Sequence, residues 1–223
     1  MRVRYVLAIG SEEGVGVVPP ASRCQGRGIT AARVVLSIRG EIVVKLSVIG
    51  CGYLGAVHAA SMAELGHEVV GVDVDSHRIS ELSARRAPFY EPRLLEILES
   101  AGSAGRLSFS TDVAALAGAQ VHFLAVGTPQ RANGNAADLS YVDAAIDSLI
   151  PHLGAGDLVV GKSTVPVGTA ERLAARVVEG APGAVLAWNP EFLREGFAVA
   201  DTMNPDRIVY GLPSASRFHE GGV

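Results

Sequence analysis

The chain has 223 residues, of which 48% are hydrophobic and 5% aromatic, and a formal net charge of -4 at pH 7, which suits one large α/β domain with short extensions. This small negative charge gives no reason to expect a nucleic acid or an anionic membrane as partner. No apolar run reaches the roughly 18 to 20 residues of a membrane span, and the two cysteines offer neither a disulfide framework nor a metal-ligand spacing, so we expect a cytoplasmic protein without a metal site.

The two ends of the chain lack the pattern of its middle. Residues 1–44 show neither the apolar core of a signal peptide nor sustained periodicity, although 34–38 would suit a short strand. The last residues, from Ser214 on, are polar and equally uninformative. We therefore expect an unpatterned, dispensable N-terminal extension over 1–44, a folded domain over 45–211 and a tail over 212–223.

From Lys45 onward, strand-like and helix-like segments alternate, which predicts an α/β fold with a mostly parallel sheet and helices on both faces. The expected strands cover a stretch that begins at Lys45 and residues 69–74, 107–110, 121–126, 157–161 and 184–188. The expected helices cover residues 53–65, 75–84, 93–100, a segment capped by Thr111 or Asp112, 138–150 and 171–178.

The first strand leads into the sequence GCGYLG, a helix follows, and the second strand brings an acid, Asp73. In this context Gly50 permits the tight turn, Gly52 lets the backbone approach a pyrophosphate, and Gly55 lets the helix pack against the strand. Phosphates would lie on the free N–H groups of the helix that starts near Tyr53, and Asp73 would accept hydrogen bonds from ribose hydroxyls and repel a 2′-phosphate. The pattern predicts a Rossmann-type doubly wound domain that binds NAD rather than NADP; the alternative is a glycine turn that binds no nucleotide.

Three later strands run into polar loops punctuated by Pro or Gly, at residues 127–129, 162–169 and 189–196. In an open parallel sheet, ligands bind outside the carboxyl ends of the strands, which is the edge that also carries the glycine turn. Any one of these loops could be an ordinary connection whose Thr, Ser or Asn caps a helix. Three of them at one edge favour a binding site.

Seven motifs together resemble those of the UDP-glucose/GDP-mannose 6-dehydrogenase family, and within it look most like the bacterial UDP-glucose 6-dehydrogenases. They are GCGYLG at 50–55, FYEP at 89–92, GTP at 127–129, DLSYVD at 138–143, KSTVPVGT at 162–169, NPEFLREG at 189–196 and DRIV at 206–209. The last three carry most of the resemblance, because they occur in order and at the spacing of the family. The resemblance covers about residues 45–211, so this segment is expected to be an NAD-binding domain.

The resemblance implies an activity. Members of the family oxidise the C6 alcohol of a nucleotide sugar to a carboxylate with two NAD molecules, a step on the way to polysaccharides. A cysteine thiol captures the intermediate aldehyde, and the resulting thioester is hydrolysed. The expected reaction is thus the oxidation of UDP-glucose to UDP-glucuronate, by a protein that is a homodimer in the family.

Matched motif by motif, the resemblance also implies roles for individual residues. The cofactor would contact Gly50, Gly52, Tyr53, Leu54 and Gly55 at the pyrophosphate turn, Asp73 and Arg78 at the adenosine ribose, and Thr111, Thr128 and Glu195. Thr128 and Glu195 would also position a catalytic water, and the nucleotide sugar would contact Glu191, Phe192, Leu193, Arg194 and Glu195. A hydroxyl and a carboxylate can hold such a water for proton transfer.

Each of these side chains also has an ordinary structural interpretation. Thr128 would serve equally well as the cap of a following helix. Glu191 and Glu195 would suit solvated acids in the first turn of a helix, where the helix dipole favours them. Arg78 would suit a surface cation.

One part of the family pattern is missing from the sequence. The family's essential Lys, Asn, nucleophilic Cys and neighbouring Asp follow the last motif found here, as do its dimer-forming helix and its second domain, and this sequence ends at Val223. Cys51 lies inside the glycine turn and Cys24 in the unpatterned extension, so neither is expected to replace the nucleophile.

We therefore expect the cofactor-binding half of a nucleotide-sugar dehydrogenase that is not competent alone. The alternatives are an NAD-binding module without turnover, a dehydrogenase of GDP-mannose or another nucleotide sugar, and a different Rossmann dehydrogenase such as a 3-hydroxyacyl-CoA or 6-phosphogluconate type.

Overall fold

A computed structural model of the chain describes residues 43–132, 134–190 and 192–212. Most of the expected N-terminal extension, with Cys24 and the strand considered at 34–38, lies outside the described residues. So do Glu191 and nearly all of the expected tail.

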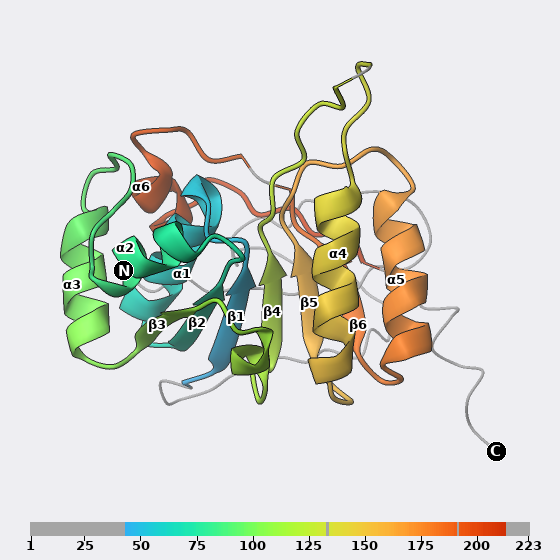
Figure 1. Cartoon of the computed structure of the whole chain (residues 1–223), viewed down its shortest axis with the longest axis horizontal. Coiled ribbons are helices and arrows are strands. Elements are labelled where there is room, and N and C mark those ends of the chain that lie inside the picture. Colours follow the sequence, from blue (N-terminus) through green and yellow to red (C-terminus); the bar gives the residue numbers. More distant parts are fainter. Residues whose placement is uncertain (1–42, 133, 191, 213–223) are drawn as a thin grey trace, which may run out of the picture.

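The centre of the fold is a sheet of six parallel strands in the order β3-β2-β1-β4-β5-β6 (Figure 1). The strands are β1 (Lys45–Ile49), β2 (Glu68–Val72), β3 (Leu107–Ser110), β4 (Val121–Leu124), β5 (Leu158–Gly161) and β6 (Val185–Trp188). This is the strand order of a doubly wound dinucleotide-binding fold, so the predicted fold class is confirmed.

Both faces of the sheet are covered, and successive side chains of one strand enter different cores. Val48 belongs to the core on one face and Ile49 to the core on the other, as the alternation of side chains along a strand requires. The first core is covered by α1 (Tyr53–Glu64), α2 (Ser76–Ser83), α3 (Leu94–Ser103) and α6 (Ala198–Met203), and the second by η1 (Val113–Leu116), α4 (Ser140–Leu149), η2 (Ile150–His152) and α5 (Thr169–Gly180).

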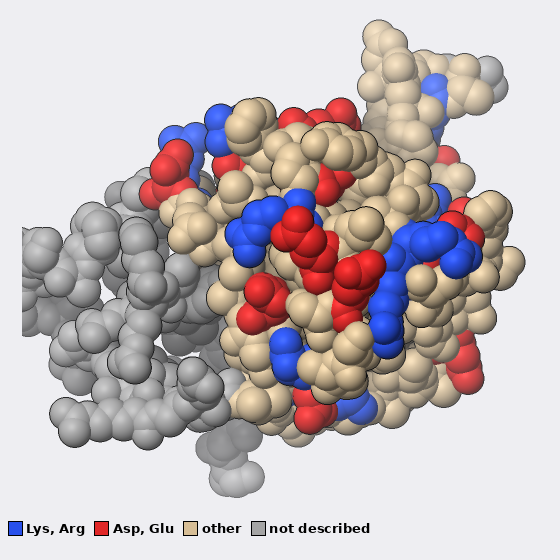
Figure 2. Space-filling model, turned by 90° about the vertical axis from the view of Figure 1, so that its left-hand side faces the viewer, with Lys and Arg blue, Asp and Glu red and all other residues tan. Residues whose placement is uncertain are grey.

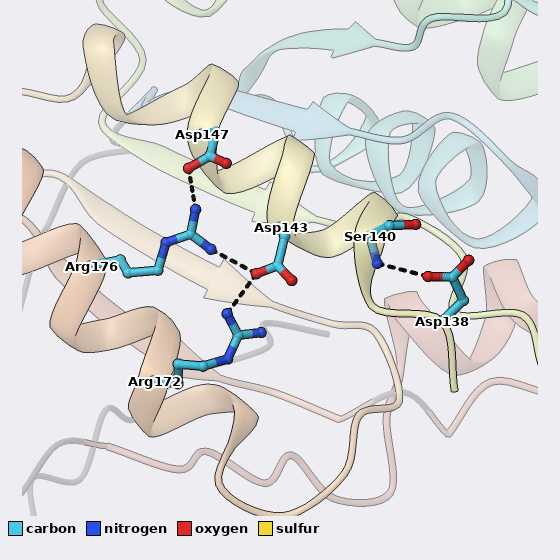
Figure 3. Close-up of polar contacts among 6 residues, drawn as sticks. All are labelled: Asp138, Ser140, Asp143, Asp147, Arg172 and Arg176. Atoms are coloured by element: carbon cyan, nitrogen blue, oxygen red, sulfur yellow. Dashed lines mark hydrogen bonds and ion pairs between the residues drawn. The ribbon is translucent and has the colours of Figure 1, made fainter. Parts of the chain in front are cut away.

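The helices α4 and α5 lie side by side over the second core and are joined by ion pairs at the surface (Figures 1 and 3). The Asp143 carboxylate of α4 accepts hydrogen bonds from Arg172, at 2.7 Å, and from Arg176, at 2.6 Å, both on α5. Arg176 also pairs with Asp147, one turn further along α4. The two helices are therefore connected by charge as well as by apolar packing.

The structure departs from the expected elements in several places. The strands expected over 69–74 and 121–126 end at Val72 and Leu124; beyond the second, the carbonyl of Val126 accepts a bond from the Ser163 hydroxyl instead of from a neighbouring strand. The helix expected from 138 begins at Ser140, because the Asp138 carboxylate accepts the Ser140 N–H in a local turn (Figure 3). The short helix α6 was not predicted at all.

Charge is mixed on the side of the molecule that Figure 2 presents, where acidic and basic side chains are interspersed. Such a surface has no extended field of one sign, which is what attraction of a polyanion requires. Among the described residues, no helix is long and apolar enough to cross a membrane, and no cluster of His, Cys, Asp and Glu has the arrangement of a metal site.

Candidate functional site

The glycine turn between β1 and α1 is shaped by two of its three glycines. Gly50 has φ +89°, and a Cβ there would lie 2.9 Å from the backbone of Ala125 and Val126. A Cβ at Gly55 would lie 1.8 Å from the Gly50 carbonyl oxygen, so α1 approaches the turn more closely than any side chain permits. A Cβ at Gly52, by contrast, would meet nothing within 4 Å. The fold thus explains Gly50 and Gly55, whereas Gly52 leaves open space in front of the helix.

The N-terminus of α1 has no partner of its own in the described chain. Its N-cap, Gly52, provides no side-chain hydrogen bond, and the first turn contains no acidic residue. The first N–H groups of a helix lack intrahelical acceptors and carry the positive end of the helix dipole. The turn that includes Tyr53 and Leu54 is therefore free to receive an anion.

Asp73 follows β2 and its carboxylate fixes the turn from the side. One oxygen, Oδ2, accepts the Cys51 N–H at 2.7 Å and the Arg78 guanidinium at 2.9 Å. The other, Oδ1, accepts the Asp75 N–H at 2.9 Å. Arg78 also lies 3.3 Å from the Asp75 carboxylate. The structure thus brings Asp73 and Arg78 together beside the glycine turn, and Arg78 is bound by two carboxylates.

The two predicted threonines lie beyond neighbouring strands. Thr111 is exposed just after β3, and Thr128 is partly exposed after β4. The Thr128 hydroxyl donates to the Thr164 carbonyl at 2.8 Å, which joins the loops that follow β4 and β5. Thr128 does not cap the next helix, because α4 begins twelve residues later with Leu139 as its N-cap.

The loop after β6 is anchored where it leaves the sheet. The Lys162 ammonium, only 7% exposed, donates to the Asn189 side-chain oxygen at 2.9 Å. The Asn189 amide in turn donates to the Val209 carbonyl at 2.9 Å. Lys162 and Asn189 therefore fix the start of the predicted substrate loop to β5 and to the chain that returns beside β6.

Further along this loop, the predicted side chains have different environments. Phe192 is 58% exposed, whereas Leu193 packs against the first core. Arg194 pairs with Asp201 of α6 at 2.7 Å. Glu195 is exposed in the turn before α6, and among the described residues it forms no hydrogen bond with Thr128 or any other side chain. Thr128 and Glu195 therefore lie at the same edge of the sheet without direct contact.

A buried carboxylate that the sequence did not single out joins the loop to the turn. Glu91, only 5% exposed, lies in the FYEP motif before α3. Its Oε2 accepts the Tyr53 hydroxyl and, at 2.9 Å, the Gly196 N–H, while its Oε1 accepts the Val199 N–H at 3.1 Å. The Gly196 N–H also lies 3.0 Å from the Tyr53 hydroxyl. The one available signal in the sequence was a single acid between aromatic residues and a proline.

Electrostatics places Glu195 close to this group. Burial and the hydrogen bond to Glu91 raise the pKa of Tyr53 to about 12, and the negative charges of Glu91 and Glu195 contribute to the same shift. A negative charge at position 195 therefore contributes to the raised pKa of Tyr53, the first residue of α1.

The thiol of Cys51 is not available as a nucleophile. Cys51 is fully buried behind the turn, and burial, followed by the charge of Asp73, raises the pKa of its thiol far above its usual value. The expectation that Cys51 cannot act as the nucleophile agrees with this position, because the thiolate is the reactive form.

Residues 44–220 match the model of the UDP-glucose/GDP-mannose dehydrogenase family, NAD binding domain. The chain belongs to this family. Its relatives include the UDP-glucose 6-dehydrogenase of Rhizobium meliloti (strain 1021), 44% identical over 172 residues that make up 76% of this chain and 39% of the relative. The UDP-glucose 6-dehydrogenase of Pseudomonas aeruginosa is 45% identical over 175 residues, or 75% of this chain and 38% of the relative.

Solved structures of nucleotide-sugar dehydrogenases share the fold. A UDP-glucose dehydrogenase from Pyrobaculum islandicum matches with a TM-score of 0.72 and 46% identity over 82% of this chain and 44% of that one. A GDP-mannose dehydrogenase from Pseudomonas aeruginosa, in a ternary complex, matches with a TM-score of 0.71 and 32% identity over 77% of this chain and 41% of that one. The chain thus spans about two fifths of the length of these relatives.

Membership in the UDP-glucose/GDP-mannose dehydrogenase family confirms the predicted family and the predicted cofactor, NAD. The residues present fit this cofactor: the N-terminus of α1 is uncapped, the space in front of Gly52 is open, and the carboxylate of Asp73 lies beside the turn. A pyrophosphate at the helix N-terminus and a ribose at the acid are the contacts that such a turn offers.

Proposed function

We propose that this chain is the cofactor-binding half of an NAD-dependent UDP-glucose 6-dehydrogenase, which oxidises UDP-glucose to UDP-glucuronate. The observation that carries the proposal is the proximity of the loop at 192–196 to the open helix N-terminus, with the Gly196 N–H 3.0 Å from the Tyr53 hydroxyl. A loop that carries a carboxylate at this position brings a substrate bound to it next to the cofactor. The 44% and 45% identity to UDP-glucose 6-dehydrogenases, against 32% to a GDP-mannose dehydrogenase, favours UDP-glucose.

In this proposal the turn and its neighbours hold NAD, which accepts hydride from the substrate when bound. Gly52, Tyr53, Leu54 and Gly55 receive the pyrophosphate at the N-terminus of α1. The ribose lies at Asp73 and Arg78, and Thr111 and Thr128 contact the cofactor from the ends of β3 and β4.

Thr128 and Glu195 act in the chemistry by holding a water between them. The Thr128 hydroxyl donates its proton to the Thr164 carbonyl, so its lone pairs remain free to accept from a water. The exposed Glu195 carboxylate can accept from the same water and stabilise positive charge that develops on a nearby nicotinamide. The nucleotide sugar contacts the segment 191–195, and the homodimer of the family is part of the same proposal.

A second function, an NAD-binding module without turnover, is favoured by one observation. The thiol of Cys51 is buried and protonated, and the other cysteine, Cys24, lies outside the described residues. The described part of the chain can thus hold the cofactor but offers no activated thiol to capture an aldehyde.

A chimera separates the two functions. In it, the part of the Rhizobium meliloti enzyme that aligns with this chain is replaced by residues 44–212, and NADH formation is followed at 340 nm with UDP-glucose and with GDP-mannose. The enzyme proposal predicts NADH from UDP-glucose. A chimera that folds and binds NAD but oxidises neither sugar supports the module instead, preferential oxidation of GDP-mannose refutes the proposed substrate, and a chain that binds no NAD refutes both functions.

A further inference from the structure

The buried carboxylate of Glu91 connects three segments that are far apart in the sequence. Its partners are the Tyr53 hydroxyl on α1 and the N–H groups of Gly196 and Val199 at the start of α6. The ring of Phe89, two residues earlier, packs against the ring of Tyr53 with 4.7 Å between centroids. Glu91 thus lies between the first turn of the cofactor helix and the loop that ends in Glu195.

A carboxylate adds nothing to apolar packing, and burying one costs free energy unless it is hydrogen-bonded. Three donors compensate its charge, and two of them are backbone N–H groups at the beginning of α6, where the helix supplies no acceptors of its own. The compensation therefore works in both directions. Glu91 accepts the N–H groups at the start of α6, and these N–H groups hold the Glu91 carboxylate next to Tyr53.

From this geometry we infer that Glu91 is a positioning residue. It holds the loop that carries Glu195 against the N-terminus of α1, so that the Glu195 carboxylate faces the cofactor. Gly196, the residue after Glu195, is bound directly to Glu91, and so the hydrogen bond fixes the backbone next to the side chain that the proposed function assigns to the water. The functional part of this inference rests on that proposed function. Tyr53 is the second positioning residue of the pair.

The hydrogen bonds of Glu91 predict which contacts Glu91→Gln would break. A carboxylate offers two oxygens to its three donors, whereas an amide offers one oxygen and an NH2 group that cannot accept. At least one backbone N–H of the loop then faces a donor. The exposed Glu96 on α3 gives the matched control, because Glu96→Gln makes the same chemical change without a bonded partner among the described residues.

Amide hydrogen exchange of the whole chain, measured by NMR, tests the inference. In Glu91→Gln, protection at Gly196, at Val199 or at both should fall at least tenfold, and in Glu96→Gln protection at both amides should change less than twofold. Tyr53→Phe removes one of the two acceptors of the Gly196 N–H and leaves Glu91 Oε2 at 2.9 Å, so protection at Gly196 should fall less than tenfold and protection at Val199 should not change.

A titration of Tyr53, followed by carbon NMR, reports the same contact independently of packing. Its pKa of about 12 should fall in Glu91→Gln, because the hydrogen bond and the charge of Glu91 are lost, while burial, the largest cause of the raised pKa, remains. A residue that only fills space would leave this pKa unchanged.

The inference is overturned if Glu91→Gln keeps wild-type protection at both amides, or if Glu96→Gln loses as much. Should Glu91→Gln fail to fold, Tyr53→Phe decides: a loss of less than tenfold at Gly196 with none at Val199 supports Glu91 as the acceptor that holds the loop, and a loss of tenfold or more at either amide overturns the inference. Neither readout needs the cofactor. A wild-type chain that binds no NAD would therefore refute the proposed function separately, while exchange and titration decide whether Glu91 holds the loop.

Discussion

Two substitutions in the glycine turn, Gly55→Ala and Gly52→Ala, each add one methyl group. Together they should separate what the fold requires from what the cofactor requires. In Gly55→Ala the new Cβ would lie 1.8 Å from the Gly50 carbonyl oxygen, about 1.2 Å closer than the 3.0 Å below which Cβ contacts are essentially never seen. The obstacle is backbone, so α1 must move away from the sheet. Overpacking of this kind costs about 1 to 3 kcal/mol, and we expect Gly55→Ala to lower the free energy of unfolding by about 2 kcal/mol or more.

Gly52→Ala should change the stability of the fold little but weaken the binding of NAD. The added Cβ meets no atom of the protein within 4 Å, and φ at Gly52 is -62°, which alanine adopts freely. Alanine is a poorer N-cap than glycine, which costs a few tenths to about 1 kcal/mol, while the stiffer unfolded chain returns about 0.4 to 1 kcal/mol. Stability should thus change by less than about 1 kcal/mol. The methyl group, however, occupies the space through which a pyrophosphate reaches the helix, and NAD affinity should fall at least tenfold, or about 1.4 kcal/mol.

Urea unfolding measures the first quantity and calorimetric titration with NAD measures the second. Gly154→Ala is the control, because its Cβ would make only an ordinary 3.6 Å contact, in the turn that leads into the opposite end of β5. A Gly52→Ala variant with wild-type affinity for NAD would refute the proposed path of the pyrophosphate. A Gly55→Ala variant with wild-type stability would refute the argument from close approach.

Three further predictions follow from charges in the structure. Asp73→Asn keeps an acceptor but loses the negative charge that opposes a 2′-phosphate, so the ratio of NAD to NADP affinity, measured by titration, should fall at least threefold. Burial lowers the pKa of His58 well below 6.5, so mild acid protonates this imidazole in the unfolded chain but not in the folded one. The free energy of unfolding should therefore fall by up to ~1.4 kcal/mol per pH unit below pH 6.5. In His58→Phe it should fall less steeply, as urea unfolding at several pH values would show. Hydrogen bonding to Arg172 lowers the pKa of Asp143 below 3.8, so the stabilisation is present above pH 3.8 and is lost as the pH falls through the lowered pKa of the folded chain. Asp143→Asn should cost about 0.5 to 1 kcal/mol at pH 7 in urea unfolding, and progressively less as the pH falls below 3.8.

Each of these predictions has an outcome that contradicts it. An unchanged cofactor preference in Asp73→Asn would mean that this carboxylate does not face the ribose. Equal pH dependence in wild type and His58→Phe would assign the acid sensitivity to other groups, for which the exposed His77→Gln is the control. A cost of Asp143→Asn that persists in 1 M salt would show that the pairs between α4 and α5 act by packing.

The part of the site that could be predicted from sequence is the part that is local in sequence. The turn from Gly50 to Gly55 and the acid at Asp73 lie within one βαβ unit, so the geometry that each residue needs follows from its neighbours along the chain. The alternation of apolar segments predicted the sheet for the same reason. The bounds of the elements differed by a few residues, because side chains such as Asp138 redirect the backbone at the ends.

The contacts that sequence could not predict are those between distant segments. Glu91 is separated from Gly196 by 105 residues and from Tyr53 by 38, and no local pattern shows that a carboxylate in one loop satisfies N–H groups of another. The helix α6 was missed for a related reason. Its six residues are too few to form a helix by propensity, and it forms because Glu91 accepts the N–H of Val199 and because Ala198 and Val199 are buried.

Titration of the purified chain with NAD, with NADP in a parallel experiment, tests the central claim most directly. The open N-terminus of α1 beside Asp73 predicts one saturable site for NAD per chain and at least tenfold weaker binding of NADP. A chain that unfolds cooperatively, and is therefore folded, yet shows no saturable binding of NAD would contradict the claim that this turn is a cofactor site.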